Sequence, residues 1–166
     1  MGKTSKSTHH TNIKHIIIQA GGKGTRLEGL TRNKPKCLVP YDNLPIIFHL
    51  FRKFKGAKFT IIADYKIEVL QKYLTIFAKD VDYRILRAKN EGTIAGIGEA
   101  ISDFSENEPF MIVWCDLILS REFRLPNFGE LREKMLDSTH KSNTKAVSPP
   151  PNLRAKSRAN RIMIAS

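Results

Sequence analysis

The chain has 166 residues and a formal net charge of +12, because 28 lysines and arginines outnumber 16 aspartates and glutamates. A hydrophobic fraction of 41% excludes a wholly disordered protein and is sufficient for one domain with a core. No apolar run approaches the ~20 residues that cross a bilayer, and the polar start of the chain lacks the pattern of a signal peptide. Two cysteines without a CxxC spacing argue against a disulfide framework or a zinc knuckle. These features favour a cytoplasmic location.

The positive charge is concentrated at the two ends of the chain. Residues 15–119 carry 15 basic and 12 acidic side chains, whereas residues 138–166 carry six basic side chains and no acidic one. We interpret residues 1–14 as a polar extension and residues 138–166 as a disordered basic tail, since neither has enough apolar surface to order itself. The domain is therefore placed at residues 15–137, with an amphipathic helix at 127–136 near its end, and we expect no nucleic-acid partner.

Between these ends, short apolar runs alternate with helical stripes of apolar residues. The runs predict strands over residues 16–18, 58–63, 81–86 and 110–114, and the stripes predict helices over 45–54, 67–77 and 94–104. This alternation indicates an α/β fold with a Rossmann-like, three-layer arrangement around a parallel sheet. The run at 110–114 is apolar throughout, so it predicts a central strand.

Ligands bind at the carboxyl ends of the strands in such sheets, and there residues 19–27 form a glycine-rich loop. The glycines allow backbone N–H groups to approach an anion closely, and Lys23 and Arg26 add positive charge. The spacing differs from the GxxxxGK[ST] P-loop and from the dinucleotide-binding GxGxxG, which argues against a Rossmann dehydrogenase. Taken alone, the loop fits an anion cradle or a simple chain reversal equally well.

Residues 21–38 make the signal specific. They read GGKGTRLEGLTRNKPKCL, which resembles the signature of the sugar-1-phosphate nucleotidyltransferases (nucleotide-sugar pyrophosphorylases), roughly GGxGTRLxPLTxxxPKxL, with Gly29 in place of a proline. The resemblance extends to about Leu119. It implies the nucleotide-diphospho-sugar transferase type of fold and an enzyme that binds a nucleoside triphosphate with Mg²⁺. Such an enzyme transfers the nucleotidyl group to a sugar 1-phosphate, giving a nucleotide sugar and pyrophosphate.

The resemblance also implies roles for individual residues. Arg26 would neutralise the departing pyrophosphate, and Lys36 would hold the reacting phosphates. Asp116 would bind the catalytic Mg²⁺, although Cys115 stands before it where the family usually has glycine. The glycine loop and a loop that contacts the base would bind the triphosphate through Ala20, Gly21, Gly22, Lys23, Gly24, Thr25, Gly92 and Thr93. Thr93 is equally suited to cap the third helix.

Some of the family pattern is missing downstream. The family's second metal-binding aspartate has no counterpart, since the chain has no aspartate after Asp137. We therefore expect a C-terminally incomplete domain that binds nucleotide but turns over slowly or not at all, with a last strand missing, an exposed sheet edge and a tendency to form oligomers. Two alternatives stay open: a cytidylyltransferase for a small phosphorylated alcohol such as phosphocholine, and a non-catalytic nucleotidyltransferase-like structural subunit. The sequence does not identify the base.

Overall fold

A computed structural model describes residues 13–87, 93–105, 108–123 and 162–165. Its main feature is a parallel sheet of five strands in the order β5-β4-β1-β6-β7. The strands, in chain order, are β1 (His15–Gln19), β4 (Lys58–Ala63), β5 (Tyr83–Arg87), β6 (Phe110–Trp114) and β7 (Ile162–Ala165). The predicted parallel sheet is confirmed, and β6 lies between β1 and β7 as an interior strand.

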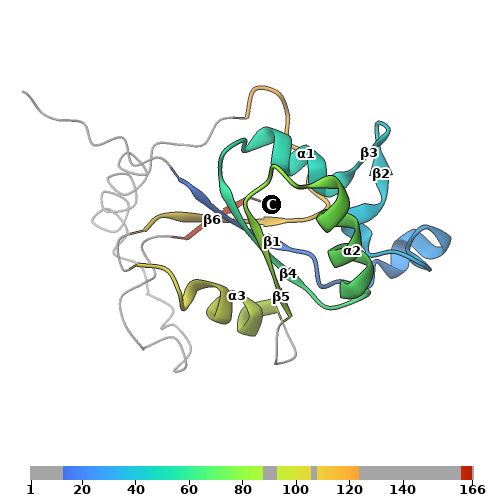
Figure 1. Cartoon of the computed structure of the whole chain (residues 1–166), viewed down its shortest axis with the longest axis horizontal. Helices are drawn as coiled ribbons and strands as arrows, with labels where there is room; N and C mark the ends of the chain where they lie inside the picture. Colours follow the sequence, from blue (N-terminus) through green and yellow to red (C-terminus); the bar gives the residue numbers. More distant parts are fainter. Residues whose placement is uncertain (1–12, 88–92, 106–107, 124–161, 166) are drawn as a thin grey trace, which may run out of the picture.

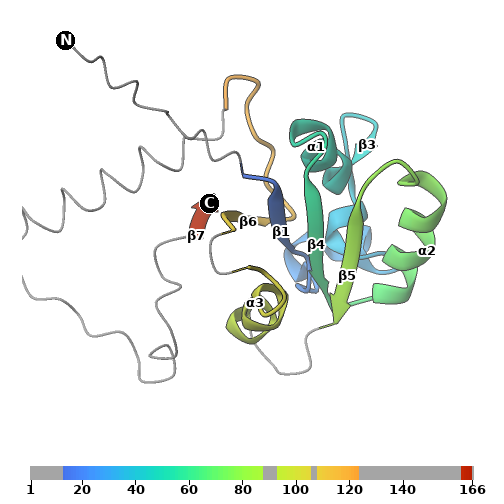
Figure 2. The same ribbon diagram turned by 60° about the vertical axis from the view of Figure 1, so that its left-hand side comes forward.

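Three α-helices cover the sheet on both faces. They are α1 (Ile46–Lys53), α2 (Ile67–Phe77) and α3 (Thr93–Ile101). Helices α1 and α2 lie on one face and α3 lies on the other (Figures 1 and 2). This is the three-layer α/β architecture that the sequence predicts.

The central strand β1 shows why apolar runs without alternation become buried strands. Ile16 and Ile18 point into the core beneath α1 and α2, whereas Ile17 points into the core beneath α3. All three side chains are at most 1% exposed. A strand covered on both faces is therefore apolar at most of its positions.

Some boundaries differ from the prediction. The third predicted strand starts at Tyr83 rather than at residue 81, and a two-stranded hairpin that we did not predict precedes α1. The hairpin pairs β2 (Pro40–Tyr41) with β3 (Leu44–Pro45) in antiparallel fashion. Its turn residues Asp42 and Asn43 have φ of +47° and +59°, a conformation that these residue types tolerate and that matches the twist of a tight hairpin.

The structure differs from two expectations about the ends of the chain. Ile13, assigned to the polar extension, is 5% exposed and belongs to the core. In the predicted disordered tail, Ile162–Ala165 form strand β7, which pairs in parallel with β6 beyond β1 (Figure 2). The apolar residues at 162–164 suit a strand at that edge, and β6 is therefore paired on both sides, with β1 and with β7. The rest of the tail and the predicted helix at 127–136 lie outside the described residues.

None of the helices in the described ranges is long and apolar enough to cross a membrane.

Candidate functional site

The loops that follow β1, β4 and β6 meet at the carboxyl edge of the sheet. Because β1 lies between β4 and β6, the glycine loop after β1 is flanked by Asp64 and Tyr65 on one side and by Asp116 on the other. Backbone hydrogen bonding between β1 and β4 continues to this edge, because the N–H of Ala20 donates to the carbonyl of Ile62 at 2.8 Å. The site is therefore built on rigid, buried strand ends.

The predicted residues Lys36 and Asp116 are in direct contact. Lys36 Nζ lies 2.5 Å from Asp116 Oδ2, although the two residues are 80 positions apart in the chain. Lys36 begins the short 3-10 helix Lys36–Leu38, and Asp116 follows β6. Their side chains are 28% and 39% exposed, so both charged groups remain accessible to a ligand from solvent.

The glycine loop has backbone donors available. The N–H groups of Gly21, Gly22, Lys23 and Gly24 donate to no protein atom within the described ranges. Residues 20–36 also carry five cationic side chains and one acidic one. Free amides together with excess positive charge are the features of an anion cradle.

Gly24 joins this loop to Lys36. Its φ is +64°, and a Cβ added there would lie 3.0 Å from Thr31 Cγ2 and 3.3 Å from Lys36 Cβ. Both the backbone conformation and the space therefore require glycine. The close approach sets the position of Lys36 relative to the loop.

The rest of the motif folds into the 3-10 helix Thr25–Thr31, which is kinked at Glu28 (φ 41°, ψ −113°). The hydroxyl oxygen of Thr31 lies 3.2 and 3.3 Å from the carbonyl oxygens of Gly24 and Glu28, which share its single donated proton. The Tyr65 hydroxyl in turn donates to the Thr31 carbonyl at 2.9 Å. The family motif assigns no role to Thr31, and Tyr65 lies outside the motif.

Other predicted residues are placed with less detail. Arg26 and Lys23 are exposed on the loop, and no contact joins either to the Lys36–Asp116 pair in the part of the chain that the structure describes. Thr25 begins the 3-10 helix, and Thr93 is the first residue of α3. Gly92 lies outside the described residues. Ala20 is 1% exposed and its N–H is used by the sheet, so contact with a ligand there would have to come from another atom.

Each residue of the ion pair has a buried cysteine as its neighbour in the sequence. Cys37 is 0% exposed and Cys115 is 5% exposed, and neither forms a disulfide. Burial raises the pKa of the Cys115 thiol to about 12, aided by the negative charge of Asp116. Burial also raises the pKa of Cys37, with a smaller contribution from Cys115. Both thiols are therefore neutral near pH 7 and contribute to packing rather than to nucleophilic chemistry.

The residues at this edge fit a magnesium ion in a limited way. Among the described residues, no group of three or more His, Cys, Asp or Glu side chains could hold a metal. Asp116 alone supplies a carboxylate. Mg²⁺ is commonly bound by one or two carboxylates together with substrate phosphates and water, so a single accessible carboxylate beside an anion cradle is compatible with it.

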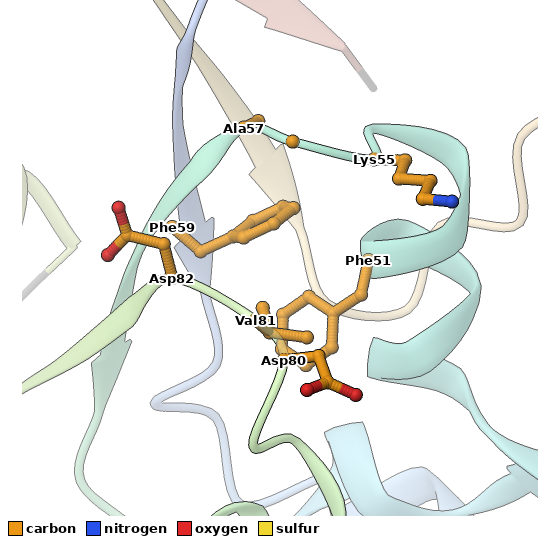
Figure 3. Close-up of a pocket in the computed structure, with 8 residues that line it drawn as sticks. Phe51, Lys55, Ala57, Phe59, Asp80, Val81 and Asp82 are labelled. Atoms are coloured by element: carbon orange, nitrogen blue, oxygen red, sulfur yellow. The ribbon is translucent and has the colours of Figure 1, made fainter.

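Two pockets of the described structure lie at the opposite end of the sheet. One of about 150 Å³ sits where α1 ends and β4 and β5 begin, and Figure 3 shows Phe59 and Val81 between Lys55 and Asp82. The Phe51 and Phe59 rings pack edge to face there, with centroids 4.8 Å apart. Another of about 230 Å³ lies between β4, β5 and the end of α3. Neither contains a residue of the predicted site.

Comparison with known proteins identifies the family. Residues 16–134 match the family model described as the MobA-like NTP transferase domain, so the chain belongs to that family. The Rossmann-like fold also matches that of a UDP-glucose pyrophosphorylase solved with UDP-glucose, at a TM-score of 0.54 and 22% identity. The match covers 78% of this chain and 55% of that one.

Two curated relatives are informative. The chain is 30% identical over 130 residues to a bifunctional sugar-1-phosphate nucleotidylyltransferase/acetyltransferase of Sulfurisphaera tokodaii, covering 78% of this chain and 31% of the relative. It is 34% identical over 82 residues to a CTP:phosphoglutamine cytidylyltransferase of Campylobacter jejuni, covering 48% of this chain and 32% of the relative. The chain thus spans about a third of the length of these relatives.

Proposed function

We propose that this chain binds a nucleoside triphosphate with Mg²⁺ and transfers the nucleotidyl group to a sugar 1-phosphate. The observation that carries the proposal is the contact of Lys36 with Asp116 beside the glycine loop. A triphosphate–metal complex needs free amides, cations and a carboxylate at one place, and this edge of the sheet offers all three. The names of the two curated relatives support the same class of reaction.

In the proposed reaction, an oxygen of the sugar phosphate attacks the α-phosphorus. A new P–O bond forms there, the bond to the β-phosphate oxygen breaks, and pyrophosphate leaves. Mg²⁺ bound at Asp116 would offset negative charge on the phosphates. The loop amides hold the β- and γ-phosphates, and Arg26 neutralises the departing pyrophosphate. Lys36 holds the α-phosphate and the acceptor phosphate, which otherwise repel each other.

The first test measures triphosphate binding. Trp114 is the chain's single tryptophan, is 37% exposed and stands two residues before Asp116, so its fluorescence should respond to a ligand. CTP, UTP, dTTP, GTP and ATP are titrated with Mg²⁺ into the wild type, Arg26→Ala and Lys58→Ala. Losing a charge-assisted contact costs about 1.5–3 kcal/mol, or roughly 10- to 100-fold in affinity, and Lys58 at the start of β4 is the matched control. Equal affinities of the two variants would remove Arg26 from the site, and no binding of any triphosphate would overturn the function.

The second test uses the ion pair itself. Lys36 and a divalent cation compete for the Asp116 carboxylate, so Lys36→Met should bind Mn²⁺ more tightly in the absence of nucleotide and bind a triphosphate more weakly. Mn²⁺ binding is followed by electron paramagnetic resonance. Lys34→Met is the control, because Lys34 is in the same motif but makes no ion pair within the described ranges. Unchanged Mn²⁺ affinity in Lys36→Met would contradict the assignment of Asp116 as the metal ligand.

The acceptor is a second question. The similarity to the phosphoglutamine cytidylyltransferase favours a small phosphorylated acceptor as the other candidate. Pyrophosphate release is measured with each triphosphate against sugar 1-phosphates and phosphocholine. Release with a sugar 1-phosphate supports the proposal, and release with phosphocholine alone supports the cytidylyltransferase alternative. Triphosphate binding without release for any acceptor would favour a non-catalytic subunit.

A further inference from the structure

A chain of hydrogen bonds connects the glycine loop to a residue outside the sequence motif. Thr31, which is 4% exposed, binds the carbonyls of Gly24 and Glu28 through its hydroxyl. Its own carbonyl accepts a hydrogen bond from Tyr65, which is 34 residues away in the loop between β4 and α2. Thr31 therefore links the backbone of the glycine loop to a neighbouring strand end.

The loop needs such support because its backbone is not in a relaxed conformation. Glu28, which is not a glycine, has φ of +41° with ψ of −113°, outside the regions that L-residues favour. Such conformations persist only when the surrounding structure holds them. The amides of residues 21–24 cannot supply this support, since they donate to no protein atom in the described ranges.

The β4–α2 loop is well placed to supply it. Asp64 approaches the glycine loop closely, since a Cβ added to Gly21 would lie 3.9 Å from the Asp64 nitrogen. Tyr65 is half-buried, and the ammonium of Lys66 lies 5.3 Å from the centre of its ring. Because Tyr65 follows the buried strand β4, its hydroxyl is carried on a rigid support.

We propose that Tyr65 is a positioning residue that holds the glycine loop, through Thr31, in the conformation that receives phosphate groups. The inference rests on the proposed function only for the identity of the ligand. A loop that is already ordered loses less conformational entropy when it binds, so the Tyr65 hydroxyl should raise phosphate affinity without touching the phosphates. Tyr65 takes no part in proton or phosphoryl transfer.

The experiment compares Tyr65→Phe with Tyr83→Phe and the wild type. Tyr83 begins β5 at the opposite end of the sheet, so its variant controls for the loss of a tyrosine hydroxyl. Amide hydrogen exchange is measured in the absence of ligand on peptides covering residues 24–32, and on β1 and β4 as references. The affinity for inorganic triphosphate with Mg²⁺, a ligand that lacks base and sugar, is measured by calorimetry.

In Tyr65→Phe we expect exchange in residues 24–32 to be about three- to tenfold faster and triphosphate affinity to fall about as much, the range expected for one hydrogen bond. The reference peptides and Tyr83→Phe should match the wild type. The proposal is overturned if Tyr65→Phe leaves amide exchange in residues 24–32 unchanged, or if it raises exchange equally throughout the sheet. It is also overturned if the wild type binds inorganic triphosphate and Tyr65→Phe binds it with the same affinity. If the wild type binds no triphosphate, the proposed function fails, while the exchange of residues 24–32 alone decides the role of Tyr65.

Discussion

Gly24 is the residue of the motif whose identity the structure explains most fully. Its positive φ and the closeness of Thr31 Cγ2 both disfavour a side chain. The other glycines of the motif differ from it: Gly22 and Gly29 have nothing within 4 Å of an added Cβ, and neither has a positive φ. A glycine is thus required at residue 24 for structure, whereas at residue 22 its benefit is access to the backbone amides.

We predict that Gly24→Ala destabilises the protein and Gly29→Ala does not. A left-handed conformation costs an L-residue about 1–2 kcal/mol, and the contact with Thr31 adds to this. The same change should weaken triphosphate binding, because the added Cβ pushes against Lys36. Urea unfolding of the two variants checks the prediction, and equal stabilities would show that the loop relaxes freely.

The two thiols beside the ion pair give a prediction about alkaline stability. The pKa of Cys115 is raised from 9.0 to about 12, so between these values the folded state holds a proton that the unfolded state has lost. The contribution of Cys115 to the free energy of unfolding is therefore complete below about pH 9 and is lost as the pH rises towards 12. Between pH 9 and 12, Cys115→Ala should therefore lose less unfolding free energy than the wild type. A disulfide-exchange reagent at pH 8 should modify neither thiol until denaturant is added, and rapid modification of the native protein would contradict their burial.

At the scale of elements, the segment after β6 is fastened to the end of α1. Lys53, in the last turn of α1, donates to the carbonyls of Ser120 and Arg121 at 2.6 and 3.1 Å and lies 5.8 Å from the centre of the Phe123 ring. Leu117, Leu119 and Phe123 also pack against the core on this face. Asp116 is therefore held between β6 on one side and a fixed segment on the other.

We predict that Lys53→Met loosens this segment. The two hydrogen bonds are exposed, so the loss of unfolding free energy should be only about 1 kcal/mol. Amide exchange over residues 117–123 should accelerate, and Mn²⁺ binding at Asp116 should weaken. Arg52→Met, one residue earlier and exposed, is the control. If both variants leave the exchange of residues 117–123 unchanged, the apolar contacts alone hold the segment.

At the scale of the whole molecule, the two ends of the parallel sheet have different roles. The carboxyl edge contains the glycine loop, Lys36 and Asp116, whereas the amino edge carries packed aromatic residues and His15 at the start of β1. His15 lies 3.3 Å from Glu108, and its ring packs against Phe104 with centroids 4.7 Å apart. Its side chain is only 17% exposed.

Desolvation lowers the pKa of His15 below 6.5, and the charges of Lys58 and Arg84 act in the same direction, while Glu108 and Asp82 oppose them. Between the folded pKa and 6.5, the unfolded chain therefore binds more protons than the folded one. The contribution of His15 to stability is present above pH 6.5 and is lost as the pH falls through the folded value. We predict that His15→Gln loses less unfolding free energy than the wild type between pH 8 and pH 5. Parallel pH profiles of the two proteins in urea unfolding would refute this.

Local patterns were sufficient to predict much of this molecule. The largely apolar runs at 16–18, 58–63 and 110–114 predict buried strands, because a strand covered on both faces is apolar at most of its positions. The stripe at 67–77 predicts α2 because apolar positions three and four apart share one face of a helix. The strand and helix predictions needed only neighbours in sequence. The expectation that Lys36 and Asp116 belong to one site came instead from the resemblance to the family.

Tertiary structure decided what depends on residues that are far apart in the chain. The contact between Lys36 and Asp116 needs β1 and β6 paired in register, and the hydrogen bond from Tyr65 to Thr31 needs β4 on the other side of β1. The placement of 162–165 beside β6 likewise depends on an unpaired strand edge, which the residues of that short apolar run do not encode by themselves. A sequence pattern indicates which surface of a segment is buried. The segment that covers this surface is selected by packing of the whole chain, because many segments offer equivalent apolar or hydrogen-bonding surfaces.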